Sequence, residues 1–198
     1  MDSTKQQILD LVRQRGVARP RDLVAAGLPR HYLRRLTEAG LVERVGRGLY
    51  SLPGDEPTEH RTLAEVAARV PHGIIVLLSA LQLYGLTSQM PHRVWVAIGP
   101  KDRAPATELP LRIVRFSGAA LTQGIEEQVI DGVTVRVTSP AKTIADCFKY
   151  RNKIGLDVAI EALRLCIESR RCSRSELWQY ATIDRVANVM RPYLESVA

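Results

Sequence analysis

The sequence predicts an α+β protein: an N-terminal winged helix-turn-helix, then a mixed α+β domain with a small, largely antiparallel sheet and a helical C-terminal end. Three observations carry this prediction. The first quarter alternates short helical segments with glycine stops and ends in a hairpin signal, the middle holds apolar runs of strand length, and apolar residues recur at helical spacing from Leu156 onward. The polar, turn-rich bridge Pro53–Pro57 separates two expected domains, 1–53 and 58–198.

The first domain is expected to contain three helices and a hairpin. Residues 4–15 carry an apolar stripe at helical spacing, and Gly16 ends that helix. A short second helix begins near Pro20, and a third ends at Gly40. Two short apolar runs around residues 46–48 then predict a tight hairpin, which would be the wing.

The third of these helices would present a cationic face to DNA. At about 100° per residue, Leu33 and Leu36 define its inward side, and a recognition helix directs its N-terminal residues toward base edges in the major groove. Arginine binds guanine through two hydrogen bonds, and other arginines bind phosphates. The expected DNA-binding residues on this helix, the second helix and the hairpin are Arg19, Arg21, Arg30, His31, Arg34, Arg35, Arg44 and Arg47.

Positive charge is concentrated on this domain. The chain of 198 residues has a net charge of +7, and residues 1–53 hold ten Lys/Arg against five Asp/Glu, which places +5 of the total there. An arginine-rich helix face is often only solvated, and some winged helices dock proteins instead. The concentration of charge nevertheless favours double-stranded DNA as the partner.

The second domain is expected to begin with helices and continue with strands. An amphipathic helix covers residues 58–70, and residues 73–86 are apolar almost all round, which indicates a buried helix after a short extended start. Residues 94–98 and 111–116 have the pattern of strands. A hairpin is expected at 125–137, because Asp131-Gly132 suits a two-residue turn between apolar runs.

The C-terminal part is predicted to be helical. Ser139 is expected to cap a helix with Pro140 at its first position, reaching to about Tyr150. Ser173 and Glu176 have the spacing of a capping box at the start of a later helix, and Pro192 should bend or shorten the last one.

Catalysis, metals and cofactors are not expected. The chain contains no phosphate-binding loop, metalloprotease, nucleophile-elbow or dinucleotide motif, and its 4 histidines lack metal-ligand spacing. Cys147, Cys166 and Cys172 form no CxxC pair, so free thiols in a reducing cytosol are expected. Because no signal peptide or membrane span is indicated, a cytoplasmic protein without membrane contact is expected.

The chain resembles the AbiEi-type antitoxins of type IV toxin–antitoxin systems, from about Thr4 to about Glu168. The resemblance is carried, in this order, by YLRRLTEAGLVERVGRGLYSLP, LLSALQLYGLTSQMP, VWVAI and VRVTSPAKTIADCF. It implies an autorepressor whose winged helix binds inverted repeats in its promoter and whose C-terminal domain counters a nucleotidyltransferase-like toxin, directly or indirectly. Lys142 and Asp146 lie in the last of these segments and are candidate antitoxin residues, although a helix cap and a core stripe explain that segment equally well.

Two other interpretations stay open. A ligand-responsive transcriptional regulator would sense a small molecule in an apolar pocket of its second domain. An enzyme tethered to DNA, such as a nuclease, is disfavoured because the sequence lacks metal-binding carboxylate motifs. A nucleotidyltransferase gene just downstream would favour the antitoxin.

Overall fold

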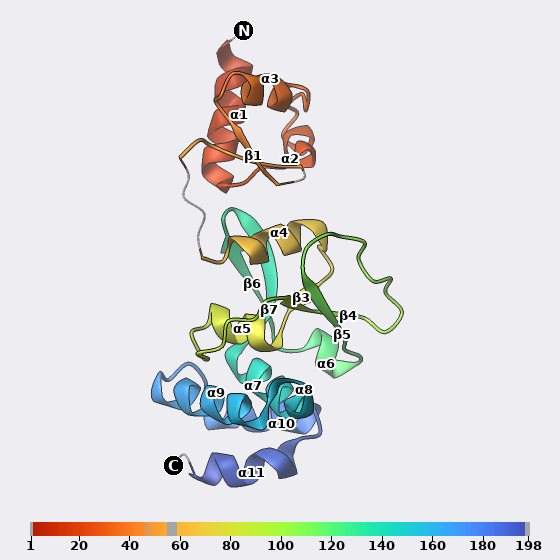
Figure 1. Cartoon of the computed structure of the whole chain (residues 1–198), viewed down its shortest axis with the longest axis vertical. Helices are drawn as coiled ribbons and strands as arrows, with labels where there is room; N and C mark the ends of the chain where they lie inside the picture. Colours follow the sequence, from red (N-terminus) through yellow and green to blue (C-terminus); the bar gives the residue numbers. More distant parts are fainter. Residues whose placement is uncertain (1, 47, 55–58, 197–198) are drawn as a thin grey trace. The chain divides into compact units, whose positions relative to one another are not determined.

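The computed structural model describes residues 2–46, 48–54 and 59–196, and the chain divides into two compact units (Figure 1). The first unit comprises Met1–Arg69 with Val129–Thr134, and the second comprises Val70–Gln128 with Val135–Ala198. In the described ranges, no helix is long and apolar enough to cross a membrane.

Helices lead into a small sheet in the first unit. The elements up to residue 69 are α1 (Asp2–Arg15), α2 (Pro20–Ala25), α3 (Tyr32–Glu38), β1 (Glu43–Gly46), β2 (Leu49–Ser51) and α4 (Arg61–Arg69). Strands β1 and β2 pair antiparallel, and β2 is also tied to the segment after α1 by hydrogen bonds in both directions between Ala18 and Tyr50, of 2.8 and 3.0 Å. The order of helices and hairpin predicted for residues 1–53 is therefore present.

Gly16 and Gly40 end helices as expected, and Gly27 follows the second helix in the same way. Gly16, Gly27 and Gly40 follow α1, α2 and α3 with φ of 66°, 72° and 67°. This left-handed conformation suits glycine because a Cβ would be strained there.

A hydrophobic core lies within residues 8–52. The apolar stripe of α1 packs with α2, α3 and the residues just before the hairpin. The buried members of this core are Ile8, Val12, Ala18, Leu23, Leu33, Leu36 and Val42. All of these residues precede Pro53.

The second unit is built on a mixed sheet. Among the described residues this sheet has five strands in the order β5-β4-β3-β7-β6, and the ends of β6 and β7 that meet at their turn, within residues 129–134, belong to the first unit. The strands are β3 (Ile74–Ile75), β4 (Val94–Ile98), β5 (Leu111–Arg115), β6 (Ile125–Ile130) and β7 (Val133–Thr138). The hairpin turn expected at Asp131-Gly132 joins β6 to β7, and the short extended start before a buried helix is β3.

The prediction of a largely antiparallel sheet is wrong. Strand β3 pairs antiparallel with β4 but parallel with β7, and β4 pairs parallel with β5. A hairpin signal acts between strands that are adjacent in sequence, whereas parallel neighbours are joined by a crossover such as the loop of residues 99–110. Strands β3 and β7 are far apart in sequence, so no local sequence pattern predicts that they pair.

Helices form the rest of the second unit. They are α5 (Leu77–Leu83), α6 (Ala119–Thr122), α7 (Pro140–Lys149), α8 (Arg151–Ile154), α9 (Leu156–Glu168), α10 (Arg174–Ile183) and α11 (Ala187–Ser196). Helix α7 is central, because its residues 141–148 are all buried and it packs against α5, α9, α10 and α11 (Figure 1). The predicted Ser139 cap and Ser173 capping box are both present, and Pro192 lies inside α11, which continues to Ser196.

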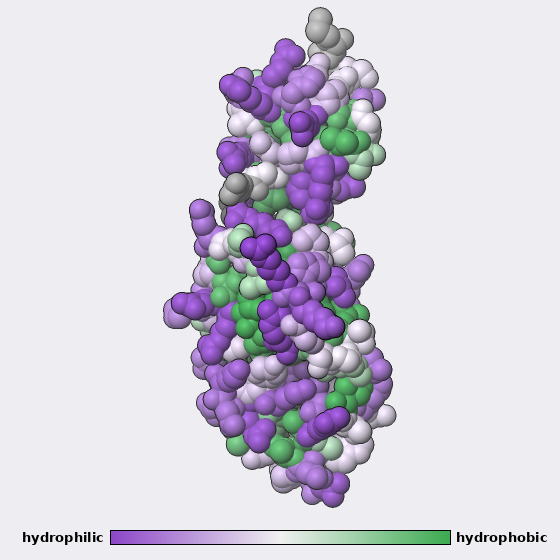
Figure 2. Space-filling view, turned by 90° about the vertical axis from the view of Figure 1, so that its right-hand side faces the viewer, coloured by the Kyte–Doolittle hydropathy of each residue, from purple (hydrophilic) through white to green (hydrophobic). Residues whose placement is uncertain are grey.

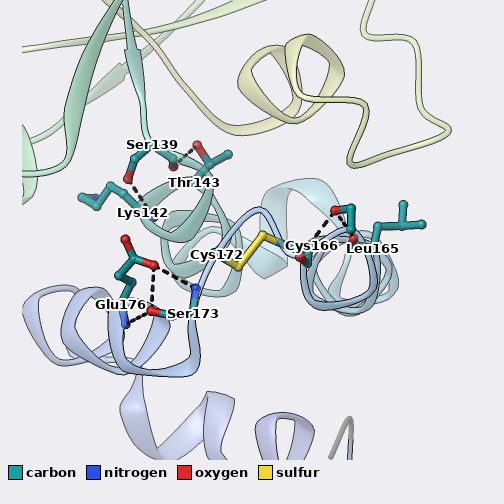
Figure 3. The surroundings of a disulfide bond; sticks show 9 residues. Ser139, Lys142, Thr143, Leu165, Cys166, Cys172, Ser173 and Glu176 are labelled. Carbon is teal, nitrogen blue, oxygen red and sulfur yellow. Dashed lines mark hydrogen bonds between the residues drawn. A yellow bond between two sulfur atoms is a disulfide. The ribbon is translucent and has the colours of Figure 1, made fainter.

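The expectation of free thiols is wrong for two of the cysteines. A disulfide joins Cys166 in α9 to Cys172, just before the capping box of α10 (Figure 3). The chain turns back after α9, which brings two cysteines that are 6 positions apart within bonding reach. Cys147 stays free and buried.

Thiol titration tests this pairing. In denaturant without reductant, we expect one thiol to react, that of Cys147, and after reduction all 3 cysteines. Labelling of three thiols before reduction would contradict the disulfide. A Cys147→Ser variant is the control, since it should show no reactive thiol until reduced.

Candidate nucleic-acid interface

Helix α3 has the two faces that its sequence predicts. Leu33 and Leu36 are buried in the core of the first unit, while Arg34 and Arg35 are exposed. Arg30 and His31, which precede the helix, are exposed as well. Figure 2 shows hydrophilic side chains over much of the face turned to the viewer, with smaller hydrophobic patches between them.

Arg34 extends from the outer side of α3. Its Nε donates a hydrogen bond of 2.8 Å to Oε1 of Glu38, and the two side chains are 86% and 61% exposed. This hydrogen bond and the charge of Glu38 raise the pKa of Arg34 above its ordinary value. Because exposed pairs of this kind are weak, the guanidinium can exchange the carboxylate for a base edge or a phosphate.

Arg35 lies on the flank of the same helix. Its Cζ is 5.3 Å from the centroid of the Tyr32 ring, at the distance of a cation–π contact. The neighbouring His31 ring lies 5.0 Å from the Tyr32 ring, tilted against it. The two adjacent arginines of α3 therefore differ in their surroundings: one is paired with a carboxylate and the other lies over an aromatic ring.

Arg19, predicted as a phosphate contact, binds within its own unit. Its Nε donates to Oδ2 of Asp22 at 2.9 Å, and its Nη2 donates to Oδ1 at 3.3 Å. The backbone N–H of Arg19 also donates to Oδ2, at 2.9 Å. Arg15 adds a further ion pair to Asp22 at 3.2 Å. The guanidinium of Arg19 thus stabilises the start of α2, while Arg21 on the same helix is exposed.

Asp22 makes the stability of this unit sensitive to acid. Burial raises its pKa, but the hydrogen bonds from Arg19 and the charges of Arg19 and Arg15 outweigh that effect, so the pKa lies below its usual value. A carboxyl with a lowered folded pKa adds stability above its unfolded pKa of about 3.9 and loses it as the pH falls through the folded value.

We therefore expect Asp22→Asn to be less stable than the parent at pH 7, and the difference to shrink as the pH falls below about 4. Urea denaturation at pH 7, 5 and 3 measures this. An unchanged difference between the two proteins across that range would contradict the ion pairs. Asp10→Asn is a matched control because Asp10 forms an exposed pair with Arg13, with side chains 47% and 64% exposed.

The hairpin residues are only partly described. Arg44 is exposed in β1, and its Nε donates to the backbone oxygen of Gly46 at 3.2 Å. Arg47, predicted at the tip of the wing, lies outside the described residues.

The candidate antitoxin residues form part of a buried charged cluster in the second unit. Nζ of Lys142 donates to Asp146 on the same helix, and to Oδ2 of Asp184 at 3.1 Å. All three side chains are 0% exposed, whereas Lys149, which lies 3.5 Å from Asp184, is 39% exposed.

Burial decides what this cluster can do. It raises the pKa of Asp146 far above the usual value, and the nearby charge of Lys142 acts against that rise. Because solvent reaches none of the three side chains, Lys142 and Asp146 cannot touch a partner directly. They connect α7 to Asp184, the C-cap residue of α10, which sequence reasoning missed because no spacing links residues so far apart.

A metal site is not indicated by the geometry. Within the ranges that the structure describes, no group of three or more His, Cys, Asp or Glu side chains could hold a metal ion.

Comparisons with known proteins concern the fold of almost the whole chain and the family of residues 6–53. A solved structure similar to this chain is the crystal structure of RV2827C protein from Mycobacterium tuberculosis, with a TM-score of 0.56 and 17% identity over 98% of this chain and 80% of that one. At this identity the similarity concerns the fold. None of the curated proteins matches the chain. Residues 6–53 match the family model described as "Transcriptional regulator, AbiEi antitoxin", which confirms over that segment the resemblance predicted from the sequence.

Proposed function

We propose that this protein is an antitoxin and transcriptional repressor without catalytic activity of its own. Residues 1–53 act as a winged helix-turn-helix that binds inverted repeats in promoter DNA, and residues 58–198 counteract a nucleotidyltransferase-like toxin in the cytoplasm. One observation carries the proposal: the segment that matches the AbiEi antitoxin regulator model is also the one that exposes Arg34 and Arg35 on a short helix over its own core.

The DNA-binding half rests on geometry and charge. Leu33 and Leu36 anchor α3, so its outer side can enter a major groove while β1 and β2 form the wing beside it. Arg34 is the expected base reader, with Arg30 and His31 at the start of the helix and Arg21 and Arg44 at flanking phosphates.

The antitoxin half rests on the description of the family that residues 6–53 match and on the charge balance of the rest of the chain. Residues 54–198 hold eighteen Lys/Arg against sixteen Asp/Glu, so attraction to DNA does not account for this part of the chain. Lys142 and Asp146 would support toxin protection from inside, by holding α7 and α10 together beneath the surface that acts on the toxin.

Co-expression separates the two functions. With the antitoxin gene on an independent promoter, Arg34→Ala/Arg35→Ala should still protect cells from the toxin encoded beside it, but should lose repression of a reporter driven by the natural promoter. Arg103→Ala/Arg164→Ala, which removes two exposed arginines of the second unit, should keep repression. Protection that disappears with the α3 arginines would contradict two separable functions.

A further inference from the structure

A small pocket on the first unit brings together two cations from different helices. It has a volume of about 200 Å³ and is lined by Lys5 of α1, by Leu41, and by Tyr32, Arg35, Leu36 and Ala39 on or next to α3. We infer that this pocket binds one backbone phosphate of duplex DNA through Lys5 and Arg35; the inference rests on the proposed DNA-binding function.

The cations of this pocket have no carboxylate partner, unlike four other arginines of the first unit. Arg13, Arg15, Arg19 and Arg34 each pair with an acid at 3.2 Å or less. Lys5 and Arg35, like Arg21, Arg30 and Arg44, have no ion pair among the described residues. What is particular to Lys5 and Arg35 is that they line one pocket together, and no acidic side chain lines it. A concave surface with two unneutralised cations attracts an anion.

The aromatic ring of Tyr32 orients one of the two cations. Arg35 lies over this ring, with 5.3 Å from its Cζ to the ring centroid, so the planar guanidinium rests on a half-buried platform. Its N–H groups remain available at the edge, in the fork that matches two oxygens of a phosphate. Lys5 is half-buried and supplies a second charge from α1. Leu36, Ala39 and Leu41 give an apolar wall suited to the sugar beside that phosphate.

The position on α3 favours a phosphate over a base. At about 100° per residue, Arg35 is turned from Arg34 toward the side of the helix that meets α1. When a recognition helix lies in the major groove, its flanks face the two sugar–phosphate walls of that groove. The pocket thus lies where the sugar–phosphate backbone at one wall of the groove would pass. Arg34 faces the groove itself and can bind base edges.

The test compares full-length variants on the promoter duplex and on an unrelated duplex over a range of salt. Lys5→Gln and Arg35→Gln should each weaken binding to both duplexes by the same factor. Each should also lower the slope of log affinity against log salt by about 1, so that affinity falls about three- to fourfold less than in the parent between 50 and 200 mM salt. Because both cations hold one phosphate, Lys5→Gln/Arg35→Gln should lower the slope by no more than about 1.

Controls distinguish this site from general charge and from base reading. Arg13→Gln removes an equal charge from α1, but at a side chain that is 64% exposed and paired with Asp10, so its slope should stay that of the parent. Arg34→Ala should reduce the preference for the promoter duplex. Thermal unfolding followed by circular dichroism checks that each variant is folded.

The outcomes separate the two levels of the proposal. Parent protein that prefers no duplex would overturn the proposed function and the pocket with it. Promoter binding with an unchanged slope in Lys5→Gln, or a loss of preference in Arg35→Gln, would overturn the phosphate site alone.

Discussion

Replacing Lys142 by methionine is expected to lower the free energy of unfolding by about 3–5 kcal/mol, because it leaves buried carboxyl groups without their cation. Lys142, Asp146 and Asp184 are all 0% exposed, and the Lys142 ammonium is bound to both acids. One carboxylate oxygen of Asp146 already has no hydrogen-bond partner, so loss of the Lys142 ammonium would leave this buried carboxyl group still less satisfied. Urea denaturation followed by far-UV circular dichroism measures the loss.

Lys149→Met is the matched control. Lys149 is the same residue type, lies on the same helix and contacts the same Asp184, at 3.5 Å, but its side chain is 39% exposed. Its replacement should cost no more than about 1 kcal/mol, because solvent reaches the Lys149 side chain and screens its interaction with Asp184. Equal losses for the two variants would show that Lys142 is not the buried partner of these acids.

Arg34→Ala/Arg35→Ala is expected to have the largest effect on DNA binding. Each arginine contact to a base or a phosphate contributes about 1–3 kcal/mol, so the double variant should lose about 2–6 kcal/mol on promoter DNA if the two effects add. Both side chains are exposed and neither belongs to the core, so the protein should remain folded. Fluorescence anisotropy with a labelled duplex, at a stated moderate salt concentration, gives the affinity.

The control is again Arg103→Ala/Arg164→Ala, which removes the same charge from exposed positions of the second unit. Its affinity for promoter DNA should stay close to that of the parent. If both double variants lost affinity equally, total charge rather than the α3 surface would account for binding.

Local signals in this sequence predict local structure well. Gly16 and Gly40 end helices, Ser139 and Ser173 cap them, and Asp131 turns a hairpin, because each acts on backbone groups within a few residues. The parallel pairing of β3 with β7 follows no such rule, because it joins Ile75 to Val137 through the packing of the whole unit.

The candidate site divides in the same way. Helical periodicity placed Arg34 and Arg35 on the exposed side of α3. It did not distinguish Arg19, whose guanidinium binds Asp22, although an acid three positions after the N-cap residue is a capping signal. The buried contact of Lys142 with Asp184 depends on how α7 meets the end of α10, which only the folded chain shows.

Footprinting of the purified full-length protein on the DNA upstream of its own gene tests the central claim most directly. We expect protection of an inverted repeat, with an affinity that falls steeply as salt rises and that Arg34→Ala/Arg35→Ala abolishes at moderate salt. Equal affinity for upstream and unrelated DNA, unchanged in that variant, would contradict the assignment of α3 as the recognition helix.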